Sequence, residues 1–598
     1  MHRVARLCGS TGVVRSRACG RQVRALARPL PEDGRTLADF LVEGRQNIVI
    51  DESKPHFEPL QPALVAKLHT TTASEAPKLY WLETYGCQMN VSDTEIVRAL
   101  LKKDGWQSAE SVEEATLVLL NTCAIRENAE QRIWNRLDEL RALKRKRRMH
   151  FRKRGGDPRL MVGVLGCMAE RLKMRLLESD KSVDMVVGPD SYRDLPRLVS
   201  EVFNTGVAAL NTQLSLDETY ADITPVREGN NGVSAFVSVM RGCNNMCTYC
   251  IVPWTRGRER SRDPDSIERE VRELANMGYR EIVLLGQNVN SYNYVDEEHL
   301  LKDDTVSTVD GFSTVYKAPR RGIQFAELVR RVARADRRVR VRFTSPHPKD
   351  FPDELLQVIA EEPNVCKSLH LPAQSGNTEC LDRMGRGYSR EAYLKLATHI
   401  RQVIPDVTLS SDFISGFCGE TEEEHQDTLT LFDAVQFEHA YMFHYSMREK
   451  TKAHRRYKDD VPLDVKKRRL GEVIERYREN KLRRLKAQGG KIHLVLLDRE
   501  ARKWLSKDSD IKVRQLYGRS DNNFSVIIEV PDDLQVPVFA HNGTHNESTN
   551  ESRMPQIGDF VAVRIREAPS GLTLRGDVMG ISDSPIFCAD EWEHLLPL

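Results

Sequence analysis

Three closely spaced cysteines constrain this chain more than any other feature. Cys243, Cys247 and Cys250 follow the apolar run Val233–Met240 in the spacing CxxxCxxC. Thiolates at this spacing can converge from one short loop on a single metal centre. The spacing is neither the CxxC pair of a zinc ribbon nor the CxxCxxC run of a bacterial ferredoxin. On a four-iron cluster, three thiolates would leave one iron open, as catalytic metal sites do. A zinc knuckle or a partly used disulfide framework is the alternative.

Three further cysteines, Cys87, Cys123 and Cys167, each come just after a predicted strand. A helical pattern follows each of them, which is typical of α/β units. The carboxyl ends of parallel strands lie along one edge of a sheet, where ligands bind. We therefore expect these thiols at one rim, with three buried structural cysteines as the alternative. The predicted strands are Leu79–Tyr85, Ala115–Leu120 and Leu160–Leu165.

Length and composition favour a soluble globular chain of several domains. The 598 residues exceed one ordinary domain and predict about three to four. No apolar run approaches the roughly 18 residues of a membrane span, so we expect no membrane partner. The 12 cysteines are too sparse for a disulfide scaffold, which favours reduced thiols and metal ligation.

The first residues have the composition of a mitochondrial presequence. Seven arginines lie within the first 28 residues, and no acid precedes Glu32. We predict a presequence over 1–31 and a polar linker over 32–77 with one short helix at Leu37–Val42. A disordered basic tail is the alternative to the presequence. Without these arginines, 89 − 7 = 82 bases face 87 acids, so RNA binding would depend on local patches.

The pattern from 78 to 203 predicts an N-terminal parallel-sheet α/β domain with a further strand at Val183–Val187, followed by a linker over 204–232. Inside this domain lies the basic run Lys144–Arg154. Such runs are most often a solvated helix end and loop. A nuclear-localisation signal and an RNA-contacting face are alternatives that the pattern does not separate.

Residues 229–462 predict a second α/β domain. Six strand-like runs recur there, usually with helical patterns between them, which is short of the eight in a closed barrel. We therefore expect an open, partial barrel with Cys243, Cys247 and Cys250 in its first βα loop, and a surface insertion at Tyr294–Ile323. The six runs are Val233–Met240, Glu281–Leu285, Val339–Phe343, Ser368–Leu371, Val407–Ile414 and His439–Tyr445.

The last part of the chain predicts a small β-barrel. A basic helical linker over 463–488 ends in Arg483-Arg484-Leu485-Lys486, and these cations are candidate phosphate contacts. Alternating apolar runs over 489–582 are typical of a small antiparallel β-barrel. Three glycosylation sequons lie in what reads as a low-complexity loop over 542–552, and we expect them to be unmodified.

Together these motifs resemble the methylthiotransferases of the radical S-adenosylmethionine superfamily. The resemblance runs from about Leu79 to about Ser582 and includes Thr84–Asn90, Asn121–Glu127 and Gly166–Glu170. It implies a partial (βα)6 core, a C-terminal TRAM domain that binds RNA, S-adenosylmethionine and two [4Fe-4S] clusters. The catalytic cluster would be held by Cys243, Cys247 and Cys250, and the auxiliary cluster by Cys87, Cys123 and Cys167.

Within this family the loop Cys243–Pro253 is similar to the MiaB branch. That branch adds a methylthio group to N6-isopentenyladenosine next to the tRNA anticodon; threonylcarbamoyl-adenosine is the alternative substrate. The leader and Ser345–Asp350 resemble animal mitochondrial members, which implies the mitochondrial matrix, mitochondrial tRNAs and a role in mitochondrial translation. Expected partners are tRNA, a ferredoxin- or flavodoxin-like electron donor and a sulfide source. Those members were named for binding a kinase activator, so an additional kinase-regulatory partner is a further alternative.

The resemblance also implies a cofactor pocket. Structural hydrogen bonding is the alternative role for each of its residues. Two departures from the family lie beside the pocket: Cys418 replaces a proline, and Glu449-Lys450 stands where glycine is usual. We expect Cys418 to be a small packing residue. The implied cofactor-binding residues are Tyr249, Gly286, Gln287, Asn288, Gln374 and Asp412.

Overall fold

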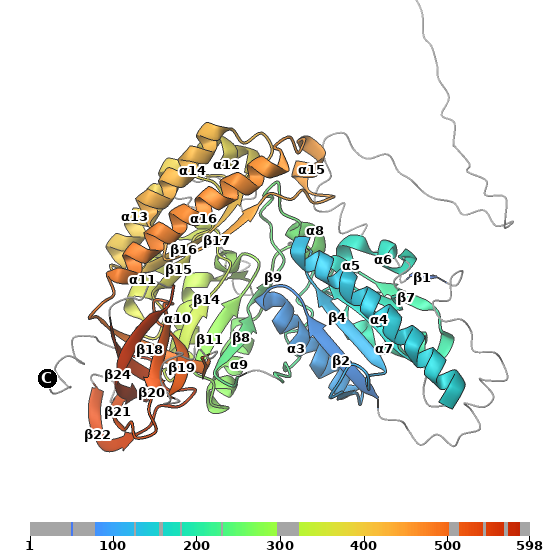
Figure 1. Ribbon diagram of the computed structural model, residues 1–598, viewed down its shortest axis with the longest axis horizontal. Coiled ribbons are helices and arrows are strands. Elements are labelled where there is room, and N and C mark those ends of the chain that lie inside the picture. Colours follow the sequence, from blue (N-terminus) through green and yellow to red (C-terminus); the bar gives the residue numbers. More distant parts are fainter. Residues whose placement is uncertain are drawn as a thin grey trace, which may run out of the picture.

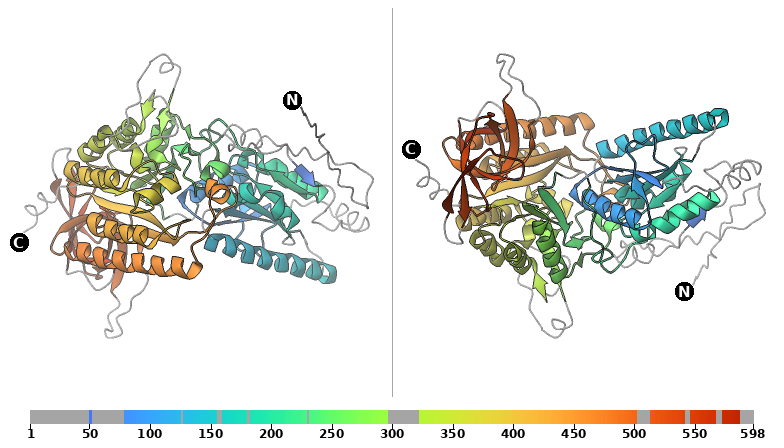
Figure 2. Two further views of the ribbon diagram at one scale, coloured as in Figure 1. Left: turned by 90° about the horizontal axis from the view of Figure 1, so that it is seen from above. Right: turned by 90° about the horizontal axis from the view of Figure 1, so that it is seen from below.

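The computed structural model forms three packed units, with the C-terminal barrel at the end away from the N-terminal sheet (Figures 1 and 2). None of the described helices is long and apolar enough to cross a membrane. The presequence, the predicted helix at Leu37–Val42 and most of the insertion Tyr294–Ile323 lie outside the described residues. The structure describes residues 49–51, 78–124, 127–154, 159–179, 182–228, 231–295, 322–501, 513–541, 546–566 and 572–586.

The N-terminal unit is a sheet in the order β1-β7-β6-β5-β4-β2-β3, parallel except where β1 joins. Its central strands are buried and mostly apolar because helices cover both faces. Helices α3 and α7 pack on one face, and α4, α5 and α6 on the other. The strands are β1 (Val49–Asp51), β2 (Leu79–Thr84), β3 (Gln107–Ser108), β4 (Leu117–Thr122), β5 (Met161–Gly166), β6 (Met185–Val187) and β7 (Ala208–Asn211). The helices are α3 (Gln88–Lys103), α4 (Glu127–Arg154), α5 (Cys167–Leu172), α6 (Met174–Glu178) and α7 (Leu195–Thr205).

Two strands of this sheet lie in segments that the sequence predicted to be linkers. Strand β7 (Ala208–Asn211) pairs in parallel with β6, beyond the expected domain end at residue 203. Strand β1 (Val49–Asp51) pairs with β7 from within the predicted linker 32–77. Both strands are short and lie towards one edge of the sheet, so they lack the long apolar run by which the central strands were found.

The central unit is the expected open barrel. Strands β8, β11 and β14 form one parallel sheet, and β15, β16 and β17 form another. A parallel bridge between Val341 and Val365 joins the two sheets, so the six strands follow one another in chain order. The strands are β8 (Ser234–Ser238), β11 (Glu281–Leu285), β14 (Arg340–Phe343), β15 (Ser368–His370), β16 (Thr408–Ser415) and β17 (His439–His444). The helices that follow the strands are α9 (Pro264–Asn276), α10 (Phe325–Ala335), α11 (Asp353–Glu361), α12 (Thr378–Met384), α13 (Arg390–Val403) and α14 (Glu422–Val435).

Helix α16 (Leu463–Lys486) is part of the fold rather than a free basic linker. Its 24 residues span about 36 Å at 1.5 Å per residue. Val473 and Tyr477 belong to the core of the central barrel, and Leu485 belongs to the core of the C-terminal barrel. The expected phosphate contact Arg484 instead donates from Nε to the buried carboxylate of Glu438 at 2.6 Å. The long helix therefore joins two cores, and Arg484 serves that packing.

The C-terminal unit is a small barrel in which two strand pairings are parallel, unlike the predicted antiparallel topology. Its strands run β20-β19-β18-β23-β24, and β20 and β24 close the barrel as a parallel pair. Part of the predicted low-complexity loop is instead strand β22, which pairs with β21 beside β24. The strands are β18 (Ile492–Glu500), β19 (Arg514–Ser520), β20 (Ser525–Val530), β21 (Val536–His541), β22 (Asn546–Arg553), β23 (Phe560–Ile565) and β24 (Leu574–Ser582).

A buried carboxylate docks the C-terminal barrel on the central one. Glu281, the first residue of β11, is fully buried. It pairs with Arg340 at 2.8 Å and Arg342 at 2.7 Å, both on β14, and with Arg519 of β19 at 2.5 Å. These guanidinium groups outweigh desolvation and hold the pKa of Glu281 well below its ordinary value. The C-terminal barrel therefore sits at the amino ends of the central strands.

Candidate metal and cofactor centre

The first cysteine triplet lies at the carboxyl ends of three neighbouring strands, as the sequence predicted. Cys87 caps α3 after β2, Cys123 follows β4, and Cys167 is the first residue of α5 after β5. Gly86 has φ 126° and lies so close to Cys123 that a Cβ on it would stand 2.7 Å from the Cys123 Cβ. Only glycine fits this approach without strain. The parallel sheet thus gathers three thiols that are far apart in sequence.

The second triplet lies in the loop after the first barrel strand. Gly242, just before Cys243, has φ 76°, and a Cβ on it would stand 1.9 Å from the Arg258 carbonyl oxygen. Its amide donates to Oε1 of Gln287 at 2.5 Å. Further along the loop, the Thr248 amide donates to the Met384 carbonyl at 2.8 Å. Both ends of the cysteine loop are therefore tied to later strands and helices of the barrel.

The thiols suit an iron–sulfur cluster better than a single zinc ion. The nine cysteines in the described part of the chain are all free. Zinc holds sulfur at about 2.3 Å, which places tetrahedral thiolates about 3.8 Å apart. Among the described His, Cys, Asp and Glu side chains, one group of three has its ligand atoms all within 4.8 Å of one another. This group is Glu422, His425 and Glu472, and it contains no cysteine. Both its carboxylates pair with Arg468. Each cysteine triplet is wider, as ligands of a bulkier cluster must be.

Burial alone would keep several of these thiols protonated. Desolvation raises the pKa of Cys167 and Cys243, and it raises the pKa of Cys250 to about 12. A metal centre deprotonates its thiol ligands, so the energy of binding would offset this cost. These buried thiols therefore need a bound cationic centre to act as thiolates, which fits a cluster site.

Two arginines that sequence reasoning missed stand beside the thiols. Arg256 Nε lies 3.1 Å from Cys167 Sγ, and Arg386 Nη1 lies 3.4 Å from Cys247 Sγ. Both side chains are buried. Each precedes a glycine in the sequence, but nothing in that local pattern distinguishes them from a surface arginine. Each guanidinium can stabilise negative charge on the sulfur that it contacts.

The two triplets meet at the interface between the domains. Arg256 follows the second triplet on α8 (Val252–Arg256), yet it contacts Cys167 of the first. Asp93 of α3 is fully buried and pairs with Arg241 at 2.8 Å and Arg256 at 2.6 Å. Desolvation would raise the pKa of Asp93, but the two arginines outweigh it and lower the pKa below its ordinary value. Cys87 also packs beside β11 of the central barrel. The buried ion pairs of Asp93 thus fix the loop of the second triplet against the sheet edge that carries the first triplet.

The residues of the predicted cofactor pocket are at strand ends, and several make structural contacts. A Cβ on Gly286 would stand 2.5 Å from Met240 Cγ. Asn288 is buried and donates to Asp350 at 3.2 Å. The hydroxyl of Tyr249 lies 3.4 Å from Arg386 Nη1. Gly286 and Asn288 therefore shape the second strand end, while Tyr249 lies inside the cysteine loop.

Gln374 and Asp412 lie together at the ends of the later strands. Gln374 has φ 72°, in the left-handed region, and its amide donates to the Asp412 carbonyl at 2.9 Å. The Asp412 carboxylate lies 3.4 Å from His370 Nε2. On β17, Tyr441 is the register partner of Asp412 and is 53% exposed. Asp412 precedes Phe413, which packs on Phe432 of α14, so Asp412 lies on the face of β16 away from that helix.

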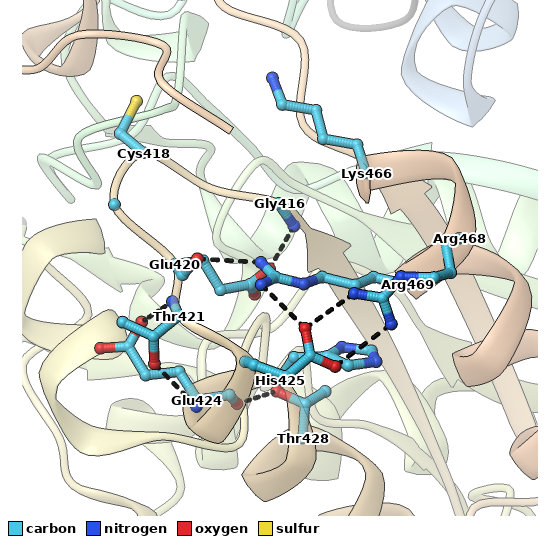
Figure 3. A network of polar contacts seen from close by, with 12 residues as sticks. Gly416, Cys418, Glu420, Thr421, Glu424, His425, Thr428, Lys466, Arg468 and Arg469 are labelled. Atoms are coloured by element: carbon cyan, nitrogen blue, oxygen red, sulfur yellow. Dashed lines mark hydrogen bonds and ion pairs between the residues drawn. The ribbon is translucent and has the colours of Figure 1, made fainter. Parts of the chain in front are cut away.

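A network at the end of β16 ties the pocket to α16 (Figure 3). The Gly416 amide donates to Glu420 Oε2 at 2.6 Å, and Arg469 of α16 donates to the same oxygen at 2.9 Å. Gly416 has φ 76°, and a Cβ on it would stand 2.3 Å from the Lys466 side chain. Cys418, the departure from the family, is buried among apolar side chains as expected. The loop 416–420 is therefore clamped by the long helix.

The second departure, Glu449-Lys450, joins the central barrel to the N-terminal domain. Lys450 has φ 73°, the conformation that glycine adopts at low cost, which accounts for the family preference. Its Nζ donates to the Arg171 carbonyl at 3.1 Å, and Glu449 pairs with Arg175 at 2.6 Å. This chain thus accepts backbone strain at Lys450 and gains contacts across the domain interface.

Comparison with known proteins agrees with this architecture. Residues 237–432 match the Radical SAM superfamily, and residues 79–188 match Uncharacterized protein family UPF0004. The chain is 50% identical over 511 residues to the mouse mitochondrial tRNA methylthiotransferase CDK5RAP1, covering 85% of this chain and 82% of that protein. The chain belongs to the radical S-adenosylmethionine methylthiotransferase family.

Bacterial members of the methylthiotransferase family are also similar. The tRNA-2-methylthio-N(6)-dimethylallyladenosine synthase of Amoebophilus asiaticus is 45% identical over 471 residues, covering 78% of this chain and 92% of that protein. Among solved structures, the radical S-adenosylmethionine methyltransferase TsrM of Kitasatospora setae is 15% identical with a TM-score of 0.42, covering 61% of this chain and 72% of that chain.

Proposed function

We propose that this methylthiotransferase adds a methylthio group to C2 of N6-isopentenyladenosine, next to the anticodon of mitochondrial tRNAs. One observation carries the proposal: two cysteine triplets from different domains meet at one interface, with Arg256 of the second loop 3.1 Å from Cys167 of the first. Relatives named for this reaction and for mitochondria support the substrate class and the organelle. We place the enzyme in the matrix, where it would support mitochondrial translation.

C2 of adenine carries no acidic proton, so acid–base chemistry alone cannot place sulfur there. When bound, S-adenosylmethionine would supply both the methyl group and the radical that removes hydrogen from C2, and the auxiliary cluster would supply sulfur. The protein itself would hold the clusters and orient the substrate base. Arg386 and Arg256 would stabilise charge beside their cysteines. The barrel would present the base, with Asp412 and Gln374 at its carboxyl rim. The ligands are Cys243, Cys247 and Cys250 for the catalytic cluster, and Cys87, Cys123 and Cys167 for the auxiliary one.

The cluster assignment is tested by iron analysis. Reconstituted protein should bind about eight irons. Replacing Cys243, Cys247 and Cys250 by Ala should leave about four, and so should replacing the other triplet. The matched control replaces three other buried cysteines, Cys366, Cys380 and Cys418, by Ala and should keep about eight. If either ligand triple variant keeps the full iron content, the assignment is wrong.

The substrate is tested with two modified RNAs. Enzyme, sulfide, an electron donor and S-adenosylmethionine are supplied with tRNA that carries either isopentenyladenosine or threonylcarbamoyl-adenosine. Nucleoside mass spectrometry should find the methylthio product only with the isopentenylated tRNA, the substrate class for which the bacterial relatives are named. A site for threonylcarbamoyl-adenosine would need a cation to face its buried carboxylate. Product from threonylcarbamoyl-tRNA alone would reassign the substrate.

A further inference from the structure

The C-terminal half of helix α4 is a cationic surface that the proposed chemistry does not use. From Leu140 to Gly156 the sequence holds no Asp or Glu, although the first half of the helix contains several acids. Arg145, Lys146, Arg152 and Lys153 are exposed. In the part of the chain that the structure describes, no carboxylate pairs with any of these four side chains. We refer to these four residues as the α4 basic patch.

The inner side of the same helix end is firmly held. Lys144 is buried and forms an ion pair with the buried carboxylate of Asp184. Arg147 donates to the carbonyls of Ala115 at 2.8 Å and Arg159 at 3.1 Å, just before strands β4 and β5. These contacts fix the rotation of the helix. The α4 basic patch therefore has a defined direction and is not a freely moving tail.

Helix α4 also relates the α4 basic patch to the cysteine rim. The helix begins at Glu127, shortly after Cys123, and runs back along the sheet to its amino edge. At 1.5 Å per residue, the α4 basic patch lies about 27–39 Å along the helix from its start. The end of the helix projects from the N-terminal unit (Figure 2). A molecule that fills the active site and extends tens of ångströms from it can reach this surface.

We propose that the α4 basic patch binds the phosphate backbone of the stem of the RNA whose loop base enters the active site. This inference rests on the proposed tRNA substrate. A nucleic-acid stem carries closely spaced phosphates, about one charge per 1.7 Å in a duplex. Without the leader the chain has 82 bases and 87 acids, so such a patch stands out electrostatically. Arg484, expected to serve this purpose, is committed to Glu438.

The test replaces Arg145, Lys146, Arg152 and Lys153 together by Gln in the full-length, cluster-loaded protein. Binding of isopentenylated tRNA is measured across a salt series. We expect the affinity at low salt to fall about tenfold or more, and the slope of log K against log[salt] to become shallower by about 3, since each lost phosphate contact removes about 0.7–0.9. Cleavage of S-adenosylmethionine without RNA should be unchanged. A variant of only Arg152 and Lys153 should show about half the change in slope.

The matched control removes the same number of positive charges from α9, α10, the turn after α10, and α13 of the central barrel. Arg272, Arg330, Arg338 and Lys395 are replaced by Gln, and the tRNA affinity and salt slope should stay at the wild-type values. If the α4 variant equals the control, the proposal is overturned. The proposal is also overturned if residues 141–154 direct a reporter protein to the nucleus while the salt dependence of tRNA binding is unchanged in the α4 variant. The run would then be a nuclear-localisation signal. Wild-type enzyme that binds no tRNA would instead refute the proposed function.

Discussion

At Lys450, a strained backbone conformation is offset by a side-chain hydrogen bond. Its φ of 73° lies in the left-handed region, which costs a non-glycine residue about 1–2 kcal/mol. Its ammonium group contacts the Arg171 carbonyl at 3.1 Å, and a hydrogen bond of this kind contributes about 0.5–1.5 kcal/mol. The two effects nearly cancel, so a residue other than glycine is tolerated here.

Two substitutions separate these effects. Lys450→Ala removes the contact and keeps the strain, whereas Lys450→Gly removes both. We expect the Gly variant to unfold at a higher temperature than the Ala variant, by the equivalent of about 1 kcal/mol. Thermal unfolding of both variants beside the wild type gives the measurement. An Ala variant more stable than the Gly variant would show that the left-handed backbone conformation carries no cost at this position.

At the scale of elements, helix α16 connects the C-terminal barrel to the loop beside the predicted cofactor pocket. Leu485 lies in the C-terminal barrel core, while Arg469 holds Glu420 beside the predicted cofactor pocket. Both charged side chains of that pair are buried. Breaking a buried pair typically costs about 3–5 kcal/mol because one charge is left without its partner. The loop 416–420 beside the predicted pocket therefore depends on α16 for its position.

Arg469→Met is expected to loosen the loop 416–420 and weaken S-adenosylmethionine binding by about tenfold. Iron content should remain at the wild-type value, because no cysteine ligand lies on that loop. Equilibrium binding of the cofactor and iron analysis give the two readouts. The double variant Arg469→Met with Glu420→Gln removes the unpaired charge and should recover part of the stability. Unchanged cofactor affinity in Arg469→Met would show that the clamp does not shape the pocket.

At the scale of the whole molecule, Glu281 determines how the C-terminal barrel is attached. Its three arginine partners come from β14 and from β19, so one carboxylate joins two units. Replacing Glu281 by Gln leaves buried guanidinium groups short of a counter-charge, and we expect a loss of about 3–5 kcal/mol. Limited proteolysis within residues 487–491, between α16 and β18, should become faster at neutral pH. Equal cleavage rates would argue against this docking role.

The same carboxylate predicts a pH dependence. Because the pKa of Glu281 is lowered in the folded protein, its contribution to stability is full above the unfolded pKa. It is lost as the pH falls below about 4.3 towards the folded pKa. Between about pH 5 and pH 3 the wild type should therefore lose stability more steeply than Glu281→Gln. Urea unfolding at several pH values measures both slopes, and parallel curves would contradict the prediction.

The sequence by itself determined the elements whose signal is local. The central strands of the N-terminal sheet are mostly apolar runs, and each of the six expected cysteine ligands follows a strand end that was visible from pattern alone. The six-stranded open barrel and the small C-terminal barrel were predicted for the same reason. The short strands β1 and β7 were missed because three or four residues carry too little periodicity.

Only the tertiary structure decided how these parts meet. Arg256 beside Cys167 is separated from it by 89 residues, and Arg386 beside Cys247 by 139. Asp93, Arg469 and Glu281 look like ordinary surface charges in the sequence. Each is buried in an ion pair with a partner from a distant part of the chain. Periodicity reports which face of one element is apolar; it contains no information about which distant charge will meet that element once the domains pack.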